Sequence, residues 1–274
     1  MTASQQTSSD ISKRLELARQ IAEEAGRLTL RYFRSPALTI DLKADRSPVT
    51  EADRQAEALL RERIEAAFPA DAILGEEHGE KPGTSGFRWV LDPIDGTKSF
   101  VAGVPLYATL VGVLQDERPM IGVIFAPAAG EMVYAAIGEG AWHRCGAEPP
   151  RPAKVSEVSR LDGAGLLTTD VAAFTTHRPV DALPAYLNLQ TKVRLARTWG
   201  DAFGYLLVAT GRAEVMIDPI MNLWDAAALL PVLSEAGGTF TDWRGRATVD
   251  AGEGLATNGR LLPEVLAALD AGTP

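Results

Sequence analysis

The spacing of apolar residues changes along this 274-residue chain, and that change constrains the fold more than any other feature. Residues 11–33 and 51–68 place apolar side chains three and four positions apart, which predicts two amphipathic helices, the first capped by Asp10 and the second by Thr50. From residue 72 onward, short apolar runs alternate with Gly, Pro and charged residues, as is typical of strands. The sequence therefore predicts a protein that mixes α and β structure.

The first half is expected to form a mostly antiparallel sheet, and the second half an alternation of strands and helices. The expected strands of the first half are 72–74, 88–91, 107–114, 120–125 and 131–136. In the second half we expect strands at 165–169, 193–197, 213–217 and 239–242, and helices at 180–189, 202–210, 224–236 and 260–269. Residues 146–152 hold three of the 17 prolines, which indicates a boundary between an N-terminal part, 1–150, and a C-terminal part, 151–274.

Composition excludes several classes of protein. Lys and Arg number 27 and Asp and Glu 36, a net charge of −9 that would repel a nucleic acid. The single cysteine, Cys145, excludes an internal disulfide and a cysteine-based zinc site, and fits a reducing compartment. No apolar run approaches the ~18 residues of a membrane span, and the N-terminus lacks the apolar core of a secretion signal. We therefore expect a cytoplasmic protein with neither membrane nor nucleic acid as a partner.

Two carboxylates directly follow an apolar run. Asp92 and Asp95 are three residues apart, and Pro93 restricts the backbone between them, so both can face one point. Such hard oxygen donors suit Mg²⁺ better than zinc. Gly96 and Thr97 would then begin a helical turn whose free N–H groups attract a phosphate. Taken alone, the pattern fits a solvated strand end and an ordinary turn equally well.

Two other acidic positions mean little by themselves. Gly75-Glu76-Glu77 follows the strand 72–74, but surface glutamate pairs are usually solvated. Asp225 stands at the start of the helix 224–236, where the helix dipole alone favours an acid. They become informative only when their order along the chain is considered together with Asp92 and Asp95.

These motifs, taken in order, resemble those of the inositol monophosphatase family of Mg²⁺-dependent phosphomonoesterases. They are Gly75-Glu76-Glu77, then Asp92-Pro93-Ile94-Asp95-Gly96-Thr97, then Trp224-Asp225 with Ala236-Gly237-Gly238. The resemblance covers nearly the whole chain and implies an α/β protein built as an αβαβα layered sandwich. It also implies one compact catalytic unit, with metal-binding motifs in the N-terminal half and substrate-pocket residues and the last metal ligand in the C-terminal half.

The resemblance implies a site for two or three Mg²⁺ ions. The implied ligands are Glu76, Asp92 and the backbone carbonyl of Ile94 for a first ion, and Asp92, Asp95 and Asp225 for a second. Paired cations would neutralise a phosphomonoester and lower the pKa of a water, so no side-chain nucleophile is required.

The resemblance also implies roles around that water. Thr97 and Asp53 would orient it, and Glu76 is another candidate general base. Asp53 equally fits a capping box with Thr50. Lys43 matches the basic residue of the family's mobile loop, although it also fits a solvated surface lysine.

The substrate would be held by two groups of residues. The N–H groups of Gly96 and Thr97, with the Asp95 side chain, are expected to hold the phosphate. The C-terminal half departs from the inositol pattern and resembles the histidinol-phosphatase branch of the family. The residues that carry this likeness are Arg197-Thr198-Trp199-Gly200-Asp201-Ala202-Phe203-Gly204-Tyr205, Asp218-Pro219, Leu167-Thr168-Thr169 and Gly238-Thr239-Phe240-Thr241-Asp242-Trp243.

Histidinol phosphate has an ammonium group and a titratable imidazole, so acids are best suited to receive its leaving group. We expect Asp201 and Asp218 to select the substrate, with Arg197 among the binding residues. Asp201 also fits a helix N-cap and Asp218 a turn acid, while Trp199 and Tyr205 fit core aromatics.

The expected function is therefore Mg²⁺-dependent hydrolysis of L-histidinol phosphate to L-histidinol and phosphate, a step of histidine biosynthesis. The alternative is a phosphatase for inositol 1-phosphate or another sugar or nucleotide monoester, and the resemblance favours a homodimer.

Overall fold

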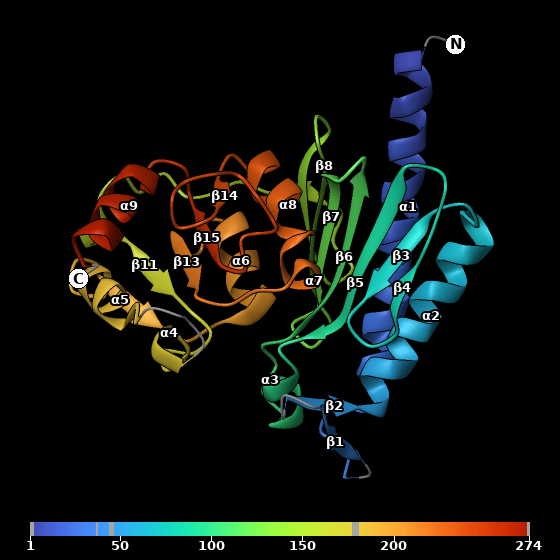
Figure 1. The fold of residues 1–274 in the computed structure, drawn as a ribbon, viewed down its shortest axis with the longest axis horizontal. Helices are drawn as coiled ribbons and strands as arrows, with labels where there is room; N and C mark the ends of the chain where they lie inside the picture. Colours follow the sequence, from blue (N-terminus) through green and yellow to red (C-terminus); the bar gives the residue numbers. More distant parts are fainter. Residues whose placement is uncertain (1–2, 37, 44–46, 177–180, 273–274) are drawn as a thin grey trace.

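The structure, a computed structural model, describes residues 3–36, 38–43, 47–176 and 181–272. Its elements form five layers, in the order helices, sheet, helices, sheet, helices (Figure 1). This arrangement confirms the predicted αβαβα sandwich.

The first sheet has eight strands in the order β10-β9-β8-β7-β6-β5-β3-β4. All neighbours are antiparallel except β3 and β5, which confirms the mostly antiparallel prediction. The strands are β3 (Ala72–Gly75), β4 (Gly79–Lys81), β5 (Phe87–Asp95), β6 (Ala108–Gln115), β7 (Arg118–Ala126), β8 (Glu131–Ala136), β9 (Gly140–Cys145) and β10 (Arg151–Pro152). The sequence analysis did not anticipate β4, β9 and β10.

Two helices, α1 (Ala3–Thr29) and α2 (Glu51–Ala67), cover the outer face of this sheet and share a core with it (Figure 1). Thr50 caps α2 as predicted. The cap predicted at Asp10 is wrong, because α1 already begins at Ala3 and the Asp10 carbonyl accepts a hydrogen bond from the Arg14 side chain within the helix. A small hairpin, β1 (Ile40–Leu42) with β2 (Pro48–Thr50), joins the two helices.

The second sheet has five strands in the order β12-β11-β13-β15-β14. Strand β11 runs parallel to both neighbours, and β15 antiparallel to both of its own. The strands are β11 (Gly165–Leu167), β12 (Leu195–Arg197), β13 (Val215–Asp218), β14 (Thr239–Thr241) and β15 (Gly254–Thr257). Strand β15 was not predicted, because it has only four residues and begins with a glycine, which leaves too short an apolar pattern to recognise.

The remaining helices fill the layers on either side of the second sheet. Helices α6 (Asp201–Ala209) and α8 (Leu229–Glu235) lie between the sheets, within one apolar core. Helices α5 (Leu183–Gln190) and α9 (Leu262–Ala271) pack on the outer face, with short α4 (Ala173–Thr176) beside them (Figure 1). Of the predicted helix 180–189, Val180 lies outside the described residues.

The helix predicted at 224–236 is interrupted. The chain forms α7 (Leu223–Ala226) and then α8, with Ala227 and Ala228 between them. Pro231 has no N–H to donate to Ala227, so a regular helical ladder lacks a bond at this point. The prediction of one continuous helix is therefore wrong, and the joint packs directly on the first sheet.

Across the described part of the chain, no helix combines the length and apolar character that spanning a membrane requires.

Candidate metal centre and active site

A bulge at the end of β5 places two carboxylates on one side of the sheet. Asp92 pairs with Leu110 of β6 and Asp95 with Ala108, so three residues of one strand correspond to two of the other. Residues three apart in a regular strand face opposite sides, and the extra residue reverses this relation. Within the bulge, the Ile94 N–H donates to Asp92 Oδ1 at 3.0 Å.

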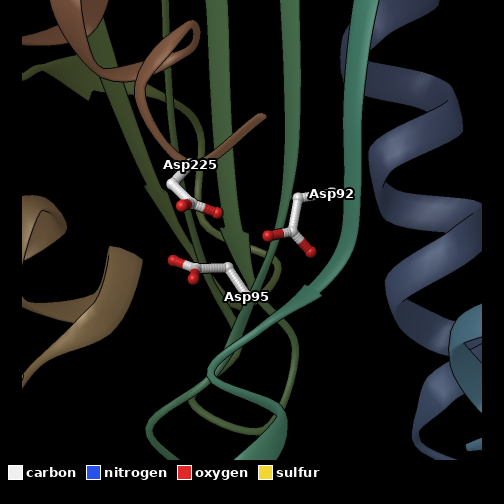
Figure 2. Close-up of side chains that lie close together, drawn as sticks. All are labelled: Asp92, Asp95 and Asp225. Atoms are coloured by element: carbon white, nitrogen blue, oxygen red, sulfur yellow. The ribbon is translucent and has the colours of Figure 1, made fainter. Parts of the chain in front are cut away.

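A third carboxylate comes from α7, which lies against the same sheet. Asn222 caps this helix, and its N–H donates to Asp225 Oδ2 at 2.6 Å, which fixes the side chain. Oxygen atoms of Asp92, Asp95 and Asp225 lie within 4.8 Å of one another (Figure 2). The fold thus brings together three acids, of which Asp92 and Asp225 are 133 positions apart in the sequence.

The close approach of these acids has an electrostatic cost. Burial, followed by the charges of Glu76 and Asp95, raises the pKa of Asp92 well above its ordinary value. Burial likewise raises the pKa of Asp95, and that of Asp225 to about 7. Buried acids that repel one another are stabilised by a cation, and carboxylate oxygens are the donors that Mg²⁺ prefers. The donor set therefore fits a divalent cation.

Glu76 approaches this cluster from β3. The Glu76 N–H donates to the Leu91 carbonyl at 3.2 Å, which extends the parallel pairing of β3 with β5 by one residue. The Lys43 ammonium bonds to Glu76 Oε1 and to Glu77 Oε1, each at 2.7 Å. Lys43 is therefore an ion-paired neighbour of the site, and the alternative of a freely solvated lysine is wrong.

Asp53 lies at the start of α2, where its carboxylate is buried. Its Oδ2 accepts from the Thr50 N–H at 2.8 Å and from the Thr50 hydroxyl at 2.6 Å. Burial raises the pKa of Asp53. The capping box is thus confirmed, while the part of Asp53 in orienting a water stays a prediction.

A cleft of about 340 Å³ opens beside the acidic cluster. Its lining residues are Ser47, Pro48, Glu76, Gly96, Thr97, Lys98, Ser99, Thr169, Asp170, Thr198, Gly200 and Asp201. Gly96 has a φ of 90°, a conformation that favours glycine, and begins α3 (Thr97–Val101) as predicted. The Thr97 hydroxyl donates to the Ile94 carbonyl at 3.0 Å. Gly96 and Thr97, expected to hold the phosphate, therefore line one cleft with the expected substrate acid Asp201, whereas Asp95 is outside the described lining.

Asp201 is positioned by contacts with two neighbouring segments. Its N–H donates to Thr169 Oγ1 at 2.8 Å, while the next N–H, of Ala202, donates to Asp95 Oδ2. Gly200 is the N-cap of α6. A Cβ at residue 200 would overlap Thr169, so the position requires glycine. The N-cap alternative for Asp201 is therefore wrong. Burial, with the charges of Asp218 and Asp225, raises the pKa of Asp201 to about 7.

Asp218 lies behind the cleft and is buried. It accepts from the Thr169 N–H at 3.0 Å and from the Tyr205 hydroxyl at 2.9 Å. Asp218 therefore does not line the cleft itself, but it contacts Thr169, which does. The sequence analysis named Thr169 only within Leu167-Thr168-Thr169 and gave it no role in the site, since a threonine after a strand has no chemical signal of its own.

Two other expectations have different outcomes. Arg197 is exposed, its guanidinium donates to the Ala196 carbonyl at 2.7 Å, and it is outside the described lining of the cleft. Tyr205 is a core aromatic, as one interpretation of the sequence expected. Trp199 is 43% exposed, so the interpretation of Trp199 as a core aromatic is wrong.

Comparisons with known proteins give a consistent result. A model of the inositol monophosphatase family matches residues 10–272. A protein named histidinol-phosphatase from Chlorobaculum parvum is 43% identical over 246 residues, 89% of this chain and 91% of that protein. One of the same name from Mycobacterium tuberculosis is 40% identical over 258 residues, 94% and 98% of the two chains. The crystal structure of the extragenic suppressor protein suhB from Bartonella henselae has a TM-score of 0.86 at 29% identity, over 95% of this chain and 99% of that one.

Proposed function

Because this chain belongs to the inositol monophosphatase family, we propose that it is a Mg²⁺-dependent histidinol-phosphatase, which hydrolyses L-histidinol phosphate to L-histidinol and phosphate. The observation that carries this proposal is the cleft with Asp201 on its wall beside the cluster of Asp92, Asp95 and Asp225. The names of the relatives that match most of the chain at 43% and 40% identity support the choice of substrate.

In this proposal, Glu76, Asp92 and the Ile94 carbonyl would hold one ion, and Asp92, Asp95 and Asp225 would hold a second. A third ion would bind weakly at Glu76. When bound, these ions supply positive charge that neutralises the phosphate and acidifies the attacking water.

The chain's own residues orient the water and move its proton. The Thr97 hydroxyl commits its proton to the Ile94 carbonyl, so its lone pairs are available to accept from a water. Asp53 is buried with a raised pKa, which suits a group that takes up a proton, and Glu76 is the other candidate general base.

The substrate lies with its phosphate against the N–H groups of Gly96 and Thr97 and its leaving group toward Asp201. A half-buried carboxylate on a cleft wall attracts an ammonium or imidazolium group more strongly than a neutral polyol. Asp218 acts indirectly in this scheme, because its contacts hold Thr169 and Tyr205. Arg197 would contact substrate only after its side chain moves.

We also propose that residues 1–150 and 151–274 act as one catalytic unit. Its ligand set supports this, since Glu76, Asp92 and Asp95 come from the first part and Asp225 from the second. A homodimer in the cytoplasm, without nucleic acid or membrane partners, completes the proposal, and the net charge of −9 supports the exclusion of nucleic acid.

The test is phosphate release from L-histidinol phosphate and from inositol 1-phosphate, measured side by side with Mg²⁺ and with EDTA. We expect a higher kcat/KM for histidinol phosphate that EDTA abolishes. A preference for inositol 1-phosphate would overturn the proposed substrate and leave the metal site standing, whereas equal activity in EDTA would overturn the metal-dependent mechanism.

A further inference from the structure

Glu57 is a fully buried acid that the proposed reaction does not use. It lies on α2, one helical turn after Asp53, and its side chain has no exposed surface. A buried carboxylate without partners strongly destabilises a fold, so the partners of Glu57 show what it does.

Those partners belong mainly to the turn that follows β3. Glu57 Oε2 accepts from the Glu77 N–H at 2.7 Å, and Oε1 accepts from the His78 N–H at 3.1 Å. The Arg61 Nε also donates to Oε1, at 2.7 Å, and the same guanidinium donates to the Gly79 carbonyl. Glu57 and Arg61 together therefore tie the whole turn to α2.

The contact also explains the glycine that begins the turn. A Cβ on Gly75 would overlap the Glu57 carboxylate, so any larger residue at 75 must displace it. Glu76 lies between this glycine and the two N–H groups that Glu57 binds. Its own N–H is bonded to the Leu91 carbonyl of β5. The backbone around Glu76 is thus fixed from both sides, while its side chain lines the cleft.

We propose that Glu57 is a positioning residue that holds Glu76 in place to bind the divalent cation. This inference rests on the proposed function only in taking Glu76 as a ligand. A side chain that orients a ligand typically changes metal affinity by about 10- to 100-fold when it is replaced.

The test compares Glu57→Gln with Glu235→Gln. Glu235 is a matched control, because its two oxygens accept from two turn N–H groups, those of Gly138 and Gly140, in a turn between β8 and β9. Glutamine keeps the size of the side chain and replaces one acceptor oxygen by an amide that faces donors. Binding of Mg²⁺ is measured by isothermal titration calorimetry and by the rise of Tm with Mg²⁺, neither of which needs a substrate.

We expect Glu57→Gln to weaken Mg²⁺ binding by about 10-fold or more, and Glu235→Gln to leave it within about twofold of wild type. Equal Mg²⁺ affinity in wild type and folded Glu57→Gln would overturn the proposal, as would an equal loss in both variants. If Glu57→Gln does not fold, Glu57→Asp replaces it, because aspartate keeps the charge but is too short to reach the turn in the same way. Its Mg²⁺ affinity is compared with those of wild type and Glu235→Gln, with the same expected results. Failure of the wild type to hydrolyse histidinol phosphate would overturn the substrate alone, since the binding measurements are independent of it.

Discussion

Gly122 in β7 lies directly beneath Ala228, so close that a Cβ at residue 122 would overlap the Ala228 carbonyl oxygen. A Cβ on Gly112 in β6 would lie 2.8 Å from the Ala227 Cβ, which is also too close. Two glycines on neighbouring strands therefore let the joint between α7 and α8 rest on the sheet, and this joint follows Asp225 by only two residues.

Gly122→Ala should push that joint away from the sheet and draw Asp225 away from Asp92 and Asp95. Overpacking of this kind costs about 1–3 kcal/mol, so Mg²⁺ binding measured by calorimetry should weaken by about 10-fold. Gly163→Ala is the control, because the nearest atom to a Cβ there is in ordinary contact at 3.4 Å. Unchanged Mg²⁺ affinity in folded Gly122→Ala would contradict the role of this contact.

Asp92→Asn should separate activity from stability. The variant loses the carboxylate shared by both proposed ions, and kcat/KM should fall by about 10³-fold, equivalent to several kcal/mol of transition-state stabilisation. In EDTA, the same variant should have a higher Tm than wild type, because a buried charge disappears while an oxygen remains to accept from the Ile94 N–H. A lower Tm in EDTA would argue against repulsion within the cluster.

The stability of the metal-free protein should fall as pH rises from about 4 to about 7. Asp201 and Asp225 have a pKa of 3.8 ordinarily and of about 7 in the folded protein. In this window the folded state binds more protons than the unfolded state, so raising the pH favours unfolding. Thermal denaturation in EDTA between pH 5 and pH 8 measures this.

With Mg²⁺ present, the fall of Tm with pH should be smaller, since the cation binds the deprotonated acids. A Tm in EDTA that rises across this range would show that other groups dominate the titration.

Asp201→Asn should reduce the preference for a cationic substrate. We expect kcat/KM for L-histidinol phosphate to fall about 10-fold relative to that for inositol 1-phosphate, because a lost charge-assisted contact costs about 1.5–3 kcal/mol at most in such sites. Asp170→Asn is the comparison, as Asp170 lines the same cleft but its carboxylate accepts from the Ala172 N–H. An unchanged ratio of the two kcat/KM values in Asp201→Asn would remove this residue from substrate selection.

The elements whose apolar residues recur at regular spacing were predictable from the sequence. The strand predicted at 131–136 has those bounds, and Thr50 caps α2, because alternation and capping act over a few residues. The acids at 76, 92, 95 and 225 were identified by motif order, and the structure places three of them in one cluster.

Features that depend on contacts between distant segments were not predictable. Asp92 and Asp95 face one side because the pairing of β5 with β6 contains a bulge, whereas the sequence analysis attributed their common direction to Pro93 and did not predict a bulge. Likewise, whether Asp218 would face the cleft depended on Thr169 and Tyr205, which lie 49 and 13 positions away in the chain. Glu57 gave no signal, since a glutamate on a helix is usually exposed.

The supply of the proposed metal ligands from both parts of the chain has a consequence for synthesis on the ribosome. Glu76, Asp92 and Asp95 emerge early, but Asp225 reaches them only after most of the second sheet and α6 have been made. Until then, the nascent chain holds several acids without the last carboxylate that completes the cluster. With the proposed ligand set, the emerging polypeptide therefore cannot hydrolyse a phosphate ester before Asp225 has been translated and α7 has docked on the first sheet.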